Sequence, residues 1–322
     1  MLCPAVHLAT TVPLIKEQSE DKSIVTMASP NLTPGDHYFT AEGITFHYRV
    51  GGTSGPFFIA QSVGWGMPGS YLWNGMGPHL EKSFRVIYFE PRGNGQSSQP
   101  PDDVMSSRVM AEDVEHLRRH LGLNSLPVLL GHSNGAGIAL RYAEQYPDHV
   151  DQLILIDSEI QDVHTTVWQD WAEKRKDNPN YAGAIAGFKR MRGDPPQTDE
   201  DFARMMDAII PWYFSDLSFL PTLVENIEGQ TYPPLVYAFL RNHSQDMIEG
   251  NASAHVGDGH KVKAKTLVIW GEEDPITSVE AGRRAAEVIP GCKLVTFEGC
   301  GHFPWIERRD EFWRVIDEFI EM

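Results

Sequence analysis

The sequence predicts an α/β fold, in which helices flank a mostly parallel sheet of eight strands. Three observations support this prediction. Strand-like and helix-like segments alternate along much of the chain, and the strand-like runs are short and apolar. In addition, Gly131-His132-Ser133-Asn134-Gly135 lies between an apolar run and a helical pattern. Such alternation is typical of parallel sheets covered by helices, and short apolar runs are typical of strands buried on both faces.

The predicted sheet opens with a hairpin around Glu42-Gly43, formed by residues 37–40 and 44–50. In its second arm, apolar residues at every second position place one face toward the core. The buried strands are expected at residues 57–60, 85–89, 128–130, 153–156, 266–270 and 294–297. Between them, apolar residues at helical spacing predict amphipathic helices, most clearly over residues 110–121 and 312–319.

The alternation stops near Glu159 and resumes near Lys261. A gap of about a hundred residues is too long for a plain connection between two strands. Helical patterns at residues 168–176, 202–210 and 234–241 predict a helical cap, inserted after the sixth strand. We therefore expect a flexible N-terminal tail (1–36), a core (37–160 and 256–322) and a cap (161–255).

The predicted cap is the candidate source of a substrate pocket. Its aromatic residues either line that pocket or pack the cap onto the core. They are Trp168, Trp171, Trp212, Tyr213, Phe214, Tyr237 and Phe239.

The pattern Gly-x-Ser-x-Gly at a strand-to-helix turn is typical of a nucleophile elbow, in which Ser133 is the nucleophile. Side chains two residues on either side would collide with the backbone of so tight a turn, and Gly131 and Gly135 remove that collision. A serine hydroxyl is a poor nucleophile at neutral pH. It needs a base within hydrogen-bond reach and an acid that orients the base.

Two later segments supply these partners. Residues 267–275 form a buried strand that ends in an acidic loop with Asp274, and residues 299–305 carry His302 just after the last strand. Both lie at the sheet edge where Ser133 is expected. Glu272 and Glu273 are expected to be solvated. Asp157 and Glu159, at the end of the sixth strand, offer an alternative position for the acid.

The oxyanion of a tetrahedral intermediate needs two backbone N–H donors. Asn134, which follows the nucleophile, is one candidate. The second is expected from the glycine-rich loop at residues 63–69, from Met67 or, as its competitor, Gly66. Otherwise the loop is only a turn. His132, within the elbow, is expected to be a packing residue.

Composition excludes several classes of partner. The formal net charge of −17 makes nucleic acid and anionic membrane surfaces unlikely partners, so a small-molecule substrate is expected. Three cysteines without paired spacing predict neither a disulfide framework nor a zinc site, and favour a cytoplasmic location. No cofactor and no metal are predicted, and the sequence makes no prediction about the oligomeric state.

Three motifs resemble the α/β-hydrolase superfamily, in the branch of proline iminopeptidases and related esterases. They are Arg92-Gly93-Asn94-Gly95-Gln96-Ser97, residues 113–123, and Gly301-His302-Phe303-Pro304-Trp305-Ile306-Glu307. The resemblance covers residues 40–160 and 260–322. It departs from the family where Trp65-Gly66 replaces the common His-Gly of the oxyanion loop, and where Glu90-Pro91 precedes Arg92. Serine at position 133 argues against the family members that use an aspartate nucleophile.

The resemblance implies a cofactor-independent serine hydrolase that cleaves a small ester, lactone or thioester through a Ser-His-Asp triad and an acyl-enzyme. One alternative is an aminopeptidase of the proline iminopeptidase type, in which Glu225, Glu228 or Asp246 would hold the free N-terminus. Another is a non-hydrolytic biosynthetic or ligand-binding role, because one fold serves many functions.

Overall fold

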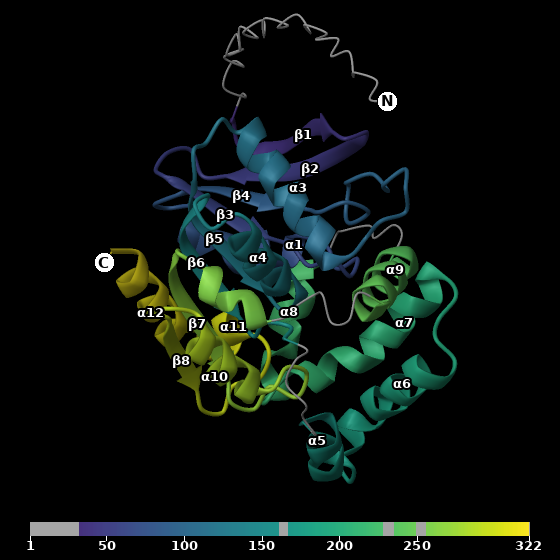
Figure 1. Cartoon of the computed structure of the whole chain (residues 1–322). Helices are drawn as coiled ribbons and strands as arrows, with labels where there is room; N and C mark the ends of the chain where they lie inside the picture. Colours follow the sequence, from purple (N-terminus) through teal and green to yellow (C-terminus); the bar gives the residue numbers. More distant parts are fainter. Residues whose placement is uncertain (1–31, 161–166, 228–234, 249–255, 322) are drawn as a thin grey trace, which may run out of the picture.

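The computed structural model describes residues 32–160, 167–227, 235–248 and 256–321, which include eight strands in a single sheet (Figure 1). The order across the sheet is β1-β2-β4-β3-β5-β6-β7-β8. Strand β2 pairs antiparallel with β1 and β4, and the other pairs are parallel. The predicted fold is therefore confirmed. The strands are β1 (Gly35–Ala41), β2 (Ile44–Gly51), β3 (Phe57–Gln61), β4 (Arg85–Phe89), β5 (Leu126–His132), β6 (Val150–Ile156), β7 (Lys265–Gly271) and β8 (Lys293–Phe297).

The predicted hairpin is present, with Ala41 opposite Ile44. Its two turn residues, Glu42 and Gly43, have positive φ angles of 49° and 78°, as a tight hairpin turn requires. Strand β1 begins at Gly35, so the last two residues of the predicted tail pair with β2. Residues 1–31 of that tail lie outside the described residues.

Helices cover both faces of the sheet. One apolar core lies between the sheet and the face formed by α3, α4 and α10 (Figure 1). A second core lies on the opposite face, under α1, α2, α11 and α12. The predicted helices over 110–121 and 312–319 correspond to α3 and α12. The bounds are α1 (Ser70–Gly75), α2 (Gly77–Leu80), α3 (Ser107–His120), α4 (Asn134–Gln145), α10 (Val279–Val288), α11 (Pro304–Glu307) and α12 (Arg309–Glu321).

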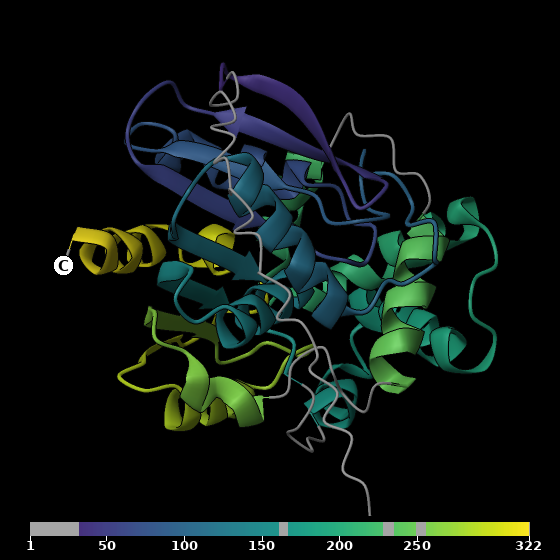
Figure 2. The ribbon, with the colours of Figure 1, turned by 45° about the horizontal axis from the view of Figure 1, so that its top comes forward.

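Between β6 and β7 the described chain is helical, as the sequence predicts. We call residues 167–227 and 235–248 the inserted segment. Its helices α6, α7 and α9 gather at one side of the sheet (Figures 1 and 2). Helices α6 and α8 were not predicted, and residues 161–166, 228–234 and 249–255 lie outside the described part of the chain. The helices are α5 (Val167–Arg175), α6 (Ala182–Gly193), α7 (Asp199–Ile209), α8 (Leu220–Ile227) and α9 (Leu235–Ile248), with the short 3-10 helix η2 (Ile210–Tyr213) after α7.

A buried arginine organises the middle of the inserted segment. Arg175 lies within 5 Å of the ring centroids of Trp171, Tyr181 and Trp212. Its guanidinium donates hydrogen bonds to the backbone carbonyls of Trp212 and Phe214. None of the helices that the described residues form has the length and apolarity needed to cross a membrane.

Candidate active site

Ser133 lies at the sharp turn between β5 and α4. Its backbone has φ 55° and ψ −126°, which is a strained conformation for a residue with a side chain. A Cβ atom on Gly131 would come within 2.4 Å of the carbonyl oxygen of Gly135. A Cβ atom on Gly135 would come within 2.7 Å of the carbonyl oxygen of Gln61. Both glycines are therefore required by backbone contact, as the elbow interpretation expects.

His302 and Asp274 form a buried pair at the carboxyl edge of the sheet. Asp274 follows β7 and His302 follows β8, and Nδ1 of His302 lies 2.7 Å from Oδ2 of Asp274. Asp274 also accepts the N–H groups of Ile276 and Thr277 and the hydroxyl of Thr277. Because a fully hydrogen-bonded carboxylate faces Nδ1, the proton belongs on Nδ1 and Nε2 is left as the acceptor.

The acceptor nitrogen of this histidine is free. In the described residues, Nε2 of His302 is buried and has no hydrogen-bond partner. Ser133 and His302 line the same cavity, so the structure brings the predicted nucleophile and base to one place. Within the described residues, Ser133 Oγ and His302 Nε2 are not joined by a hydrogen bond.

A second buried acid, Asp157, adjoins the pair. It directly follows β6, its side chain is fully buried, and its Oδ1 accepts the N–H of Gly271 at 2.8 Å. Burial and the charge of Asp274 raise the pKa of Asp157 well above its usual range. Asp274 accepts four hydrogen bonds and Asp157 one through its side chain. Two adjacent buried carboxylates do not both ionise, so the negative charge belongs on Asp274 and the proton on Asp157.

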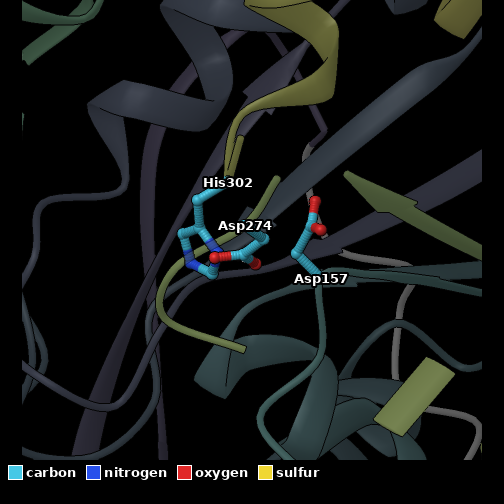
Figure 3. A group of neighbouring side chains, drawn as sticks. All are labelled: Asp157, Asp274 and His302. Atoms are coloured by element: carbon cyan, nitrogen blue, oxygen red, sulfur yellow. The ribbon is translucent and has the colours of Figure 1, made fainter. Parts of the chain in front are cut away.

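Asp157, Asp274 and His302 are also the one group in the described residues with the spacing of a metal site (Figure 3). One ligand atom from each lies within 4.8 Å of the other two. The carboxylate of Asp274 is already hydrogen-bonded to the His302 ring. A cation bound between Nδ1 of His302 and Oδ2 of Asp274 would have to break that bond, so we interpret the three residues as a buried acid pair beside the His302 ring.

The candidate oxyanion donors lie on two elements. Asn134 is the first residue of α4, where backbone N–H groups have no acceptor within the helix. In the loop after β3, the N–H of Gly66 donates to Asn94 Oδ1 at 2.7 Å, which removes it as a competitor. No hydrogen bond to the N–H of Met67 is found within the described part of the chain. Of the two predicted loop donors, Met67 is therefore the one that remains available. The backbone N–H of Trp65 likewise has no hydrogen bond within the described residues.

A mostly apolar cavity of about 270 Å³ opens beside Ser133 and His302. Its walls come from the elbow, the loop after β3, the histidine loop and the inserted segment. No lysine or arginine is found among the described residues that line it. The lining residues are Val63, Trp65, Met67, Pro68, His132, Ser133, Phe188, Met191, Phe202, Ala203, Met206, Asp207, Ile210, Tyr213, Ile227, Phe239, His243, Ile276, His302 and Phe303.

Only part of this lining was anticipated. Of the seven aromatic candidates, Tyr213 and Phe239 line the cavity. The other five pack elsewhere, and Trp212 and Phe214 are completely buried. The residues from α6 and α7 were missed. They recur at helical spacing, a signal that equally indicates packing against neighbouring helices. They are Phe188, Met191, Phe202, Ala203, Met206 and Asp207.

The other acidic candidates have different places. Glu272 is exposed, as expected. Glu273 is half-buried and accepts the hydroxyl of Ser215, so the expectation that it is simply solvated was wrong. Glu159 accepts the side-chain amide of Asn134 at 2.9 Å. None of these three is bonded to His302, whose partner is Asp274.

His132 is a buried packing residue, as expected. Its Nε2 lies 2.8 Å from the carbonyl oxygen of His302 and its ring packs 4.7 Å from that of Trp305. Burial and the neighbouring His302 ring lower the pKa of His132 well below its usual range, so the side chain is neutral. The Nε2–H group of His132 donates to the carbonyl of His302 and so supports the loop that carries this residue.

The histidine loop is also bonded to the inserted segment. The N–H of His302 donates to the carbonyl of Tyr213 at 2.8 Å. The carboxylate of Glu307 accepts the N–H groups of Gly301, Ser215 and Asp216, and so spans both segments. Burial raises the pKa of Glu307 to about 7.

The motif around Arg92 is structural. Its guanidinium makes a buried bidentate ion pair with Asp113 of α3. The Asn94 side chain holds the loop after β3 through Gly66, and the Glu90 carboxylate accepts the N–H of Gly69 in the same loop. The motif therefore supports the loop that carries Met67.

Comparisons with known proteins give a family, several relatives and solved structures to which the chain is similar. The model of the family described as "alpha/beta hydrolase fold" matches residues 64–308. The 2-hydroxymuconate semialdehyde hydrolase of Pseudomonas putida is 26% identical over 73% of this chain and 76% of its own length. The proline iminopeptidase of Thermoplasma volcanium is 25% identical over 89% of this chain and 96% of its own. The enol-lactonase structure from Burkholderia xenovorans LB400 superposes with a TM-score of 0.67 at 20% identity, covering 89% of this chain and all of that one.

Proposed function

Since the chain belongs to the alpha/beta hydrolase fold family, we propose that it is a serine hydrolase that uses Ser133, His302 and Asp274 and forms an acyl-enzyme. One observation carries the proposal. The buried His302–Asp274 pair leaves Nε2 without a partner among the described residues, beside a cavity that Ser133 also lines. A base with a fixed tautomer and a free acceptor nitrogen is what a serine nucleophile requires.

In the proposed reaction, the hydroxyl of Ser133 turns toward Nε2 of His302 and gives up its proton as Oγ attacks the substrate carbonyl carbon. The N–H groups of Met67 and Asn134 stabilise the oxyanion that forms. His302 then protonates the leaving group. In the second half, His302 takes a proton from water as the water attacks the acyl carbon, and it returns this proton to Ser133 Oγ when the bond between Oγ and the acyl group breaks. Asp274 keeps the imidazolium oriented and does not take its proton.

The cavity favours a neutral, apolar substrate. Its walls are mostly apolar, and the described residues that line it include no lysine or arginine. A carboxylate substrate would meet no fixed positive charge among these residues, and burying an unpaired charge is unfavourable. We therefore propose a small ester, lactone or thioester with an apolar acyl group.

An aminopeptidase activity is the second candidate, because one carboxylate, Asp207, lines the cavity. The predicted acidic groups do not support it. Glu225 is exposed and does not line the cavity, and Asp246 is buried and bonded to Ser107. Glu228 lies outside the described residues. Asp207 itself is exposed, so an ammonium group bound to it would remain in contact with water.

Labelling with a fluorophosphonate probe tests the proposal, with Ser133→Ala as the comparison. We expect labelling of the wild type and none of Ser133→Ala. Hydrolysis of p-nitrophenyl esters of increasing chain length and of prolyl and alanyl p-nitroanilides then distinguishes the two candidates. A folded wild type that is neither labelled nor active on either panel would refute the serine hydrolase and favour a non-hydrolytic role.

A cytoplasmic location remains a prediction from the cysteine content.

A further inference from the structure

The side chain of Asn242 joins the inserted segment to both halves of the proposed oxyanion hole. Asn242 lies on α9 and is fully buried. Its Oδ1 accepts the indole N–H of Trp65 at 2.6 Å and the side-chain amide of Asn134 at 3.4 Å. Trp65 belongs to the loop that carries Met67, and Asn134 follows Ser133. One oxygen atom therefore contacts both elements.

The orientation of this amide is fixed by its other end. Nδ2 of Asn242 donates to the carbonyl of Met105 at 2.8 Å and to the hydroxyl of Ser107 at 3.1 Å. That hydroxyl is an acceptor here because it donates its own hydrogen to Asp246. In the flipped orientation, the NH₂ group of Asn242 would face two N–H donors, and its oxygen would face a carbonyl oxygen. The hydrogen-bond inventory thus permits one orientation.

Two backbone N–H groups and one side chain hold the loop after β3 ahead of Met67. The N–H of Gly64 donates to Asn134 Oδ1, and the N–H of Gly66 donates to Asn94 Oδ1, each at 2.7 Å. Between these residues, Trp65 is held through its side chain by Asn242. The indole also packs edge-on against Phe239 of α9. The next N–H along the chain is that of Met67.

We propose that Asn242 is a positioning residue for the oxyanion hole. Its contact with the side-chain amide of Asn134 is longer than those that the same amide group makes with Glu159, at 2.9 Å, and Ser107, at 3.3 Å. Its bond to Trp65 therefore acts together with the direct bond between Gly64 and Asn134 to set the separation of the Met67 and Asn134 N–H groups. Oxyanion donors work only when they are aimed at the atom that gains charge, and a misplacement of about 1 Å costs on the order of a hundredfold in rate. The inference rests on the proposed function, in which these two N–H groups are the donors.

The test compares Asn242→Ala, Trp65→Phe and the double variant with the wild type. We expect each single variant to lower kcat about tenfold to a hundredfold with KM within about threefold. The double variant should be no slower than the slower single variant, since both remove the same hydrogen bond. A trifluoromethyl ketone, which forms the oxyanion, should lose affinity in parallel with kcat. The affinity for the product acid should stay the same.

Gln245→Ala is the matched control. Gln245 lies one turn further along α9 and bonds the N–H of Met105 and the carbonyl of Asp103, but not Trp65 or Asn134. Its kcat should equal that of the wild type. A loss of kcat in Gln245→Ala equal to that in Asn242→Ala would overturn the inference, because general anchoring of α9 would then explain both.

Wild-type kcat in Asn242→Ala and Trp65→Phe, or a change in KM alone, would also overturn it. If Asn242→Ala does not fold, Trp65→Phe carries the test, because it removes the donor and keeps an aromatic ring. If Ser133→Ala is inactive but Asn242→Ala and Trp65→Phe keep the wild-type rate, only this inference is overturned and the proposed function stands. Absence of Ser133-dependent activity in the wild type overturns the proposed function and the inference with it.

Discussion

Replacement of Asp157 by asparagine tests where the proton of the buried acid pair lies. Asparagine keeps an oxygen for the N–H of Gly271 and places an N–H donor where a protonated carboxyl carries its hydrogen. The two side chains have nearly the same shape, so the substitution opens no cavity. We expect kcat of Asp157→Asn to stay within about threefold of the wild type, a change of less than about 1 kcal/mol in the activation barrier.

The informative quantity is the pH dependence of the free energy of unfolding. Burial and Asp274 raise the pKa of Asp157 in the folded chain, so the folded state keeps a proton that the unfolded state releases. The stability that this proton provides is fully present below the unfolded pKa of about 3.9 and is lost as the pH rises. The slope for one proton is at most about 1.4 kcal/mol per pH unit. Between pH 5 and pH 7, the wild type should lose up to about 2.7 kcal/mol more than Asp157→Asn.

Urea unfolding at pH 5, 6 and 7 measures this difference, because the other titrating groups cancel between the two proteins. Asp151→Asn, at an exposed position of the same strand, is the control and should unfold in parallel with the wild type. Parallel pH curves for Asp157→Asn and the wild type would refute the placement of the proton on Asp157. A hundredfold loss of kcat in Asp157→Asn would show instead that the reaction needs the charge of this carboxylate.

Three further predictions concern the elbow, a buried carboxylate and the cavity. Gly131→Ala should destabilise the fold by about 1–3 kcal/mol in urea unfolding, because its Cβ would come within 2.6 Å of the backbone of Gly135 and Ala136. Gly193→Ala has open space and should be neutral or stabilising. Burial opposes ionisation of Glu115, but its bonds to Arg118 and Arg119 prevail and lower its pKa to about 2. The stability that this ionised form provides is present above the unfolded pKa and is lost as the pH falls toward 2. The melting temperature of Glu115→Gln should therefore fall less than that of the wild type between pH 6 and pH 3.5. Equal falls in melting temperature would contradict this prediction. Met206→Ala should enlarge the α7 wall of the cavity and shift kcat/KM toward longer acyl chains, and an unchanged chain-length order would place the acyl group elsewhere.

Local patterns were sufficient for the sheet and for the order of its edge residues. The strands are short apolar runs, and Ser133, Asp274 and His302 each directly follow a strand or its loop. Residues at the carboxyl ends of parallel strands meet at one edge whatever the sequence between them. That rule alone placed the acid beside the histidine.

Other features depend on contacts that no local pattern encodes. The choice between Asp157 and Asp274 follows from the number of donors around each carboxylate in three dimensions. The bond between Trp65 and Asn242 spans 177 residues of sequence. The apolar residues of α6 and α7 have the spacing of an ordinary buried helix face, whether that face meets a neighbouring helix or a cavity.

The bonds between the histidine loop and the inserted segment have a consequence for protein engineering. A chimera could exchange this segment for that of a relative in order to change specificity. If its junction lay after Tyr213, the residue whose carbonyl accepts the His302 N–H would come from the relative. Such a chimera would also separate Ser215 and Asp216 from Glu307. The transplant would then alter the position of His302 as well as the pocket. Residues 213–216 belong with the histidine loop as one unit, and a junction placed before them leaves the hydrogen bonds of that loop intact in the recipient.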